Sequence, residues 1–134
     1  MNREIKFRYH WTKNGPQYAA PYMVLSIYWL DGPETEVLVR KSKHETEEFT
    51  LDGGVLCQFT GLYDKRGKEI YEGDIVRCSS SNRCPHEVIW TDIPNENLGS
   101  APGWYLSDLM GGYSFTGMEE VIGNIYEHPE LLKP

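Results

Sequence analysis

The chain has 134 residues and a formal net charge of −7 at pH 7. This length is sufficient for one compact domain that folds without a disulfide or a metal. Residues 1–86 hold 12 acidic and 12 basic residues, whereas residues 87–134 hold 8 acidic residues and one lysine. The acidic C-terminal third would repel a phosphate backbone, so non-specific nucleic-acid binding through this part is disfavoured.

The sequence gives no indication of export or membrane insertion. The first ten residues are charged and lack the apolar core of a signal peptide. The longest apolar run, residues 22–30, is too short to span a bilayer. The three cysteines are expected to be reduced thiols. These features predict a cytoplasmic protein that contacts no membrane.

Alternating side chains predict strands in the first 50 residues. A strand over residues 5–11 alternates apolar and polar side chains, and a turn with Asn14 and Gly15 follows it. Two further strands are predicted at residues 22–30, with Met23, Leu25, Ile27 and Trp29 on one face, and at residues 35–40, with Val37 and Val39 on one face. Residues 41–49 are polar and of mixed charge, so a loop or one exposed helical turn is expected there.

Short strands separated by glycine-containing corners are predicted in the rest of the chain. One strand is expected within residues 51–62, and others at residues 69–71, 75–78, 86–90 and 120–126, with weaker candidates at 104–106 and 113–115. Many tight corners in few residues are typical of a small antiparallel barrel. Long loops are expected at residues 78–86 and 91–103, and Pro129 is expected to begin a terminal helical turn.

Four acidic residues lie at or beside the corners between residues 58 and 78, namely Asp64, Glu69, Glu72 and Asp74. A catalytic pair of carboxylic acids needs contrasting environments, one of which raises a pKa. Each acid here lies beside a glycine or a lysine, as turn residues do, and burial is not expected. We therefore predict that they shape turns, with Asp74 accepting backbone N–H hydrogen bonds, and that none is catalytic.

Three stretches of the chain resemble the YopX family of phage and prophage proteins. They are REIKFRYHW near the start, QFTGLYDKRGKEIYEGDIV in the middle and EVIGNIYEHPELL near the end. The resemblance implies a phage-encoded protein of the bacterial host cytoplasm, mostly β, whose second half looks like a small SH3-like barrel. It implies no activity and supplies no catalytic residue. The chain departs from the family pattern at residues 9–12, and the serine-rich loop with Cys78 and Cys84 looks peculiar to this member.

Cys78, Cys84 and His86 form a weak metal-site motif. Thiolates and imidazole are the ligands that zinc prefers, so a metal-assisted hydrolase that uses this loop is one alternative function. The spacing C-x5-C-x-H differs from the paired C-x2-C of structural zinc sites, and a fourth ligand would have to come from elsewhere. We therefore predict no cofactor.

Two groups of residues are weak candidates for binding. They are the aromatic residues Trp104, Tyr105 and Tyr113, in or beside loops, and the basic cluster of Lys65, Arg66 and Lys68. Exposed aromatic side chains stack on bases or anchor protein partners, whereas buried ones complete a core. Single-stranded nucleic-acid binding through a barrel face is the other alternative function.

The sequence thus predicts a mainly β protein with two parts. A small N-terminal antiparallel sheet, residues 1–50, precedes an SH3-like β-barrel, residues 51–134, which ends in one short helical turn. We expect a non-catalytic binding module and not an enzyme. Its expected partner is a protein, and self-association through free strand edges is compatible with this fold.

Overall fold

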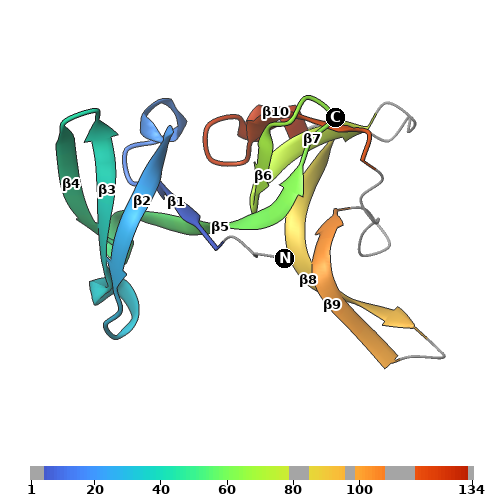
Figure 1. Ribbon diagram of the computed structural model, residues 1–134, viewed down its shortest axis with the longest axis horizontal. Coiled ribbons are helices and arrows are strands. Elements are labelled where there is room, and N and C mark those ends of the chain that lie inside the picture. Colours follow the sequence, from blue (N-terminus) through green and yellow to red (C-terminus); the bar gives the residue numbers. More distant parts are fainter. Residues whose placement is uncertain (1–4, 79–84, 96–98, 108–116, 133–134) are drawn as a thin grey trace.

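The computed structural model describes residues 5–78, 85–95, 99–107 and 117–132, with the backbone alone at residues 78, 91–95 and 99–102 (Figure 1). Strands dominate this part of the chain, so the predicted mainly β class is confirmed. The only helical segments within it are short 3₁₀ turns: η1 Pro16–Tyr18, η2 Gly32–Glu34, η3 Leu51–Gly53 and η4 Pro129–Leu132. The last of these is the predicted terminal helical turn. None of the helical segments described has the length and apolar character that crossing a bilayer requires.

The first sheet has six strands in the order β4-β3-β2-β1-β5-β6, and all neighbours are antiparallel. The strands are β1 Phe7–Trp11, β2 Pro21–Tyr28, β3 Glu36–Ser42, β4 Glu45–Thr50, β5 Gly54–Tyr63 and β6 Glu69–Tyr71. Its core consists of the buried residues Tyr9, Val37 and Val39, with Trp11, Tyr22, Val24, Phe49, Leu51 and Leu56 packed against them. The prediction that Val37 and Val39 share a face is thereby confirmed.

The predicted face of β2 is wrong because the strand contains a bulge. Its pairing with β3 shifts register between Val24 and Ser26, which leaves Leu25 as the extra residue. Tyr22 and Val24 therefore pack on the core, whereas Met23 and Leu25 are exposed. Alternation along a strand cannot be extrapolated through a bulge, because one extra residue exchanges the two faces.

The segment 41–49, predicted as a loop or helical turn, contains the edge strand β4. Its residues pair with β3 in the register Val37↔Phe49 and Leu38↔Glu48. An edge strand has one unpaired side, and charged side chains are common there because they discourage pairing with other chains. The polar composition that indicated a loop therefore fits this strand.

The second sheet has four strands in the order β10-β7-β8-β9. They are β7 Asp74–Cys78, β8 His86–Asn95, β9 Gly99–Leu106 and β10 Glu119–Asn124. Ile70, Val76, Val88 and Leu106 are its buried core, with Trp104 and Val121 packed beside them. The loop predicted at residues 91–103 is wrong, because β8 and β9 form a hairpin that pairs as far as Asn95↔Gly99. The prolines and glycines of this segment are typical of a loop. The hairpin forms nevertheless, because pairing between the two strands stabilises it.

Strand β5 belongs to the first sheet, and in Figure 1 it runs across the middle of the molecule toward the strands of the second sheet. Its first half pairs with β1, from Trp11↔Gly54 to Phe7↔Gln58, and its second half pairs with β6. The pairings among the described residues form two sheets and do not close a barrel. The SH3-like barrel and the division at residue 50 therefore stay predictions. The weak strand at residues 113–115 lies outside the described residues.

Candidate binding site

Asp64 organises the corner between β5 and β6, as predicted, but it is buried, which the sequence did not indicate. Its Oδ1 accepts the backbone N–H groups of Arg66 and Lys68 at 2.8 and 2.9 Å, and its Oδ2 accepts that of Val121 in β10 at 3.0 Å. Burial raises its pKa, but these N–H donors and the charge of Lys68 outweigh burial, so the pKa lies below its ordinary value.

Asp74 is also buried, with 1% of its surface exposed, and this corrects the expectation of an exposed turn residue. Its Oδ2 accepts the backbone N–H of Tyr71 at 2.8 Å, so the predicted role in the turn is confirmed. Its Oδ1 pairs with the guanidinium of Arg8 in β1. Burial raises the pKa of Asp74 above its ordinary value, although Arg8, the N–H of Tyr71 and Lys68 oppose that shift.

The other two acids of the middle stretch differ in their partners. Glu69 pairs with Lys6, and it accepts a hydrogen bond from the hydroxyl of Tyr71 at 3.2 Å. Glu72, in the turn between β6 and β7, has no cationic partner among the residues that the structure describes. Its charge raises the pKa of Glu87, for which burial is the larger cause. Glu72 is therefore the acid of this stretch whose carboxylate has neither an ion pair nor a hydrogen bond with the described residues.

Of the three residues in the predicted metal motif, His86 is the one whose side chain the structure describes. Cys84 lies outside the described residues, and Cys78 is described by its backbone in β7. His86 is buried, and its Nδ1 lies 2.7 Å from the carbonyl oxygen of Ser107. Within the described part of the chain, no three His, Cys, Asp or Glu side chains are grouped as metal ligands. The hydrolase that would use this loop stays an untested alternative.

The basic candidates lie around one carboxylate, Glu120 of β10. Lys65 and Arg66 approach it at 3.6 and 3.1 Å, and Arg77 lies 3.9 Å away. Lys68 is separate from this group and lines a different hollow. Three exposed cations around one half-buried acid give a small surface network, of a kind whose pairs contribute little to stability.

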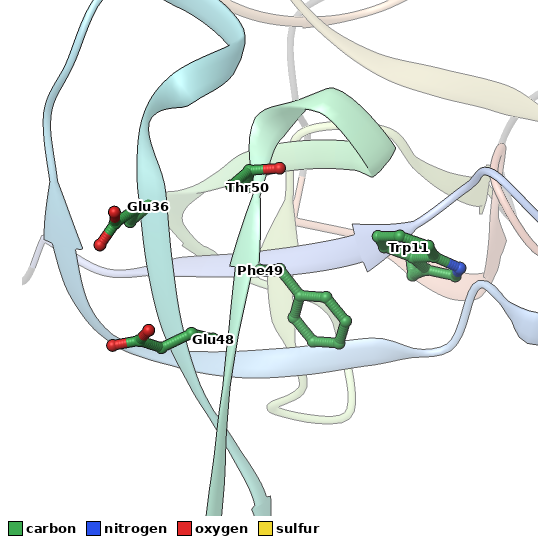
Figure 2. Close-up of a pocket in the computed structure, with 5 residues that line it drawn as sticks. All are labelled: Trp11, Glu36, Glu48, Phe49 and Thr50. Carbon is green, nitrogen blue, oxygen red and sulfur yellow. The ribbon is translucent and has the colours of Figure 1, made fainter.

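A hollow of about 360 Å³ at the β4 edge, the edge pocket, is lined by Trp11, Glu36, Glu48, Phe49 and Thr50. Figure 2 shows the rings of Phe49 and Trp11 on one side of β4 and the two carboxylates on the other. The ring of Phe49 lies 5.0 Å from that of Tyr9 and 5.3 Å from that of Trp11. The aromatic wall of this pocket is therefore already part of the first core.

A second hollow, the junction pocket, has a volume of about 250 Å³ and lies where β1 meets the second sheet. Its polar lining includes the Arg8–Asp74 ion pair, Asn124, Glu127 and His128. Asn124 donates to Glu127 at 2.8 Å, and its backbone N–H donates to Nδ1 of His128 at 3.2 Å. Most of these groups pair with or hydrogen-bond one another, as expected of a structural junction, although Nε of Arg8 is buried without a hydrogen-bond partner among the described residues.

A third hollow, the tryptophan pocket, is lined by Gln58, Glu72, Trp90 and Trp104 and has a volume of about 300 Å³. Trp90 and Trp104 are directly opposite in the β8–β9 hairpin, with ring centroids 4.9 Å apart at 73°. Trp104 packs on the second core, whereas Trp90 is 53% exposed. Gln58 belongs to β5, so the pocket lies between this strand of the first sheet and the β8–β9 hairpin.

The polar side chains of the tryptophan pocket have no hydrogen-bond or ion-pair partner among the residues that the structure describes. No hydrogen bond from the Gln58 amide, and no ion pair of Glu72, is formed with the described residues. The backbone does hold them together, because the N–H of Glu72 donates to the carbonyl of Gln58 at 2.9 Å. Open polar groups beside exposed aromatic rings are typical of a recognition site.

Among the four residues that line this pocket, the sequence indicated only Trp104 as a binding candidate. Trp90 is the last residue of the predicted strand 86–90, and Glu72 lies at a predicted turn. Tyr105 is half-buried in β9, and Tyr113 lies outside the described residues. A predicted hairpin between residues 86–95 and 99–106 would have placed Trp90 opposite Trp104. Because residues 91–103 were predicted as a loop, this pairing was missed.

The comparisons with known proteins show the family. Residues 25–133 match the family model described as YopX protein. The chain belongs to the YopX family. No curated protein matches it. The crystal structure of protein EF1440 from Enterococcus faecalis has 24% sequence identity and a TM-score of 0.63, over 98% of this chain and 100% of that chain. This likeness shows that the YopX fold described above also occurs in that protein.

Proposed function

We propose that this YopX protein is a non-catalytic binding module whose tryptophan pocket contacts a partner protein. The observation that carries the proposal is the exposure of Trp90, which has about half of its surface accessible to solvent and lines a pocket with the polar residues Gln58 and Glu72. Exposed aromatic anchors over a hollow contribute much of the binding energy in many protein interfaces. The edge and junction pockets lack this combination.

A binding role is favoured over a catalytic one by the state of the two buried carboxylates. Asp64 accepts three backbone N–H groups and Asp74 is paired with Arg8. Both acids therefore have defined structural partners. General acid–base catalysis needs a group that reaches a substrate with a pKa near the working pH.

A protein partner is favoured over a nucleic acid by the charge around the pocket. Glu72 lines the pocket, and its negative charge reaches Glu87 of β8. A phosphate backbone would be repelled there. The cationic group of Lys65, Arg66 and Arg77 is already held around Glu120. The phage origin and bacterial cytoplasmic location that the family resemblance implies are part of the same proposal.

Affinity capture with paired tryptophan variants tests the proposal. Tagged wild type, Trp90→Ala and Trp29→Ala would be expressed in bacterial host cells that carry the gene in its natural context, and the captured proteins would be identified by mass spectrometry. Trp29 is the matched control, because it is 65% exposed and follows β2 in the other sheet. Thermal unfolding would confirm that each variant is folded.

We expect that wild type and Trp29→Ala capture at least one protein that Trp90→Ala does not capture. Equal capture by all three proteins would contradict a role for the tryptophan pocket. Loss with Trp29→Ala alone would move the interface to the exposed face of β2. A partner that nuclease treatment removes would indicate nucleic-acid binding instead.

A further inference from the structure

We infer that the tryptophan pocket binds a positively charged side chain, the guanidinium of arginine or the ammonium of lysine, presented by the partner. This inference rests on the proposed function and names the chemistry of its ligand. Trp90 and Trp104 supply aromatic faces, and Glu72 supplies the countercharge. Indole is the aromatic ring that attracts cations most strongly.

The chain itself combines these elements at two other places. Lys6 lies over the ring of Phe59 at 5.0 Å and pairs with Glu69. Arg8 lies over the ring of Tyr71 at 4.5 Å and pairs with Asp74. Each of these sites consists of a cation, an aromatic ring and a carboxylate. The tryptophan pocket has the rings and the carboxylate, and the described residues place no cation in it.

The electrostatics of the pocket also favour a cation. Glu72 lies close enough to Glu87 to raise the pKa of that residue, in addition to the effect of burial. Two neighbouring acids without a described cationic partner repel each other, and a bound cation would relieve that repulsion. The side-chain carbonyl of Gln58 is an additional hydrogen-bond acceptor for a ligand N–H group. An uncharged ligand of the same shape would use the rings and leave the carboxylate unpaired.

Single amino-acid probes test the inference without knowledge of the partner. The full chain, labelled with ¹⁵N at tryptophan, would be titrated with Nα-acetyl-arginine amide, Nα-acetyl-lysine amide and Nα-acetyl-citrulline amide. Citrulline has nearly the shape of arginine but no charge. The four indole N–H signals come from Trp11, Trp29, Trp90 and Trp104, and tryptophan-to-phenylalanine variants would assign them.

We expect saturable shifts of the Trp90 and Trp104 signals with arginine or lysine amide, and none with citrulline amide at the same concentrations. Glu72→Gln should weaken the charged probes roughly fivefold, as loss of a partly exposed ion pair does. Glu34→Gln is the matched control for net charge, because Glu34 is an exposed acid in η2. It should bind as wild type does.

Equal shifts with citrulline amide, or equal affinity of Glu72→Gln and Glu34→Gln, would overturn the inference. The same holds if neither charged probe shifts the two signals. The outcomes separate this inference from the proposed function. A partner lost only by Trp90→Ala, with no charged probe bound, would retain the binding module and reject the cation. If a charged probe binds but no captured protein depends on Trp90, the cation site would be retained and the proposed protein partner would be rejected.

Discussion

Arg8 of β1 and Asp74 of β7 form an ion pair that joins the two sheets, and both side chains are largely removed from solvent. They are 66 residues apart in sequence. The guanidinium of Arg8 also lies over the ring of Tyr71. The face of β1 that carries Arg8 and His10 therefore faces the second sheet and not water.

Asp74→Ala should destabilise the protein strongly, because it leaves the charge of Arg8 buried without a partner. Removal of one member of a buried pair typically costs about 3–5 kcal/mol. Urea unfolding of both proteins would measure the difference. Asp52→Ala is the control, because the Asp52–Lys13 pair is 4.0 Å long and mostly exposed. A similar small loss in both variants would show that the Arg8–Asp74 pair contributes little.

Asp64→Asn should cost about 2–3 kcal/mol near neutral pH, because the amide cannot accept all three N–H groups that the carboxylate accepts. The folded-state pKa of Asp64 lies below its ordinary value of 3.8. Its stabilisation is therefore present above that value and is lost as the pH falls through the lower folded-state pKa. Unfolding curves between pH 7 and pH 2 should converge for wild type and variant at the acidic end. A constant difference across this range would contradict the assignment.

His10 should make the protein sensitive to mild acid. Its Nδ1 lies 2.6 Å from the carbonyl oxygen of Ala19, and its ring lies 4.6 Å from that of Tyr126. Burial lowers the pKa of His10 from 6.5 to about 4. Folding therefore favours the neutral ring. Stability is complete above the unfolded-state value of 6.5 and falls as the pH drops toward 4, by up to about 3 kcal/mol.

His10→Gln should remove this pH dependence, because glutamine has no titratable group and retains an N–H donor for Ala19. Denaturant midpoints measured at intervals from pH 7.5 to pH 4 would show it. His44→Gln changes an exposed histidine and should leave the wild-type slope intact. If His10→Gln and wild type lose stability in parallel, other groups cause the acid sensitivity.

Gly54→Ala should lower the stability of the protein more than Gly67→Ala does, although of these two glycines it is Gly67 that has a positive φ, +84°. A Cβ at Gly54 would lie 2.3 Å from the carbonyl oxygen of His10 and 2.4 Å from a ring carbon of Tyr9. A Cβ at Gly67 meets nothing within 4 Å, so that variant incurs only the left-handed strain of roughly 1 kcal/mol. Thermal unfolding would rank the two variants. The reverse order would mean that β1 and β5 can separate at no great cost.

Strands with regular alternation could be predicted from the sequence because their signal is local. The side chains of β1 alternate over its full length, and in β3 the buried Val37 and Val39 lie on the predicted face. The corners at Asp64 and Gly73 could also be predicted, because aspartate and glycine favour turn conformations in any sequence context. Strand β4 and the β8–β9 hairpin were missed because their strand structure depends on neighbouring strands and not on their own residues.

The sequence by itself determined a mainly β chain, its turn-forming acids and its membership of the YopX family, since each depends on residues close together in the chain. The tertiary structure decided which polar residues are buried and which aromatic residues meet. Arg8 reaches Asp74, and Trp90 reaches Trp104 beside Glu72, only because sheet pairing brings distant segments together. Burial and pairing between distant residues are properties of the packed chain, so no local pattern can specify them.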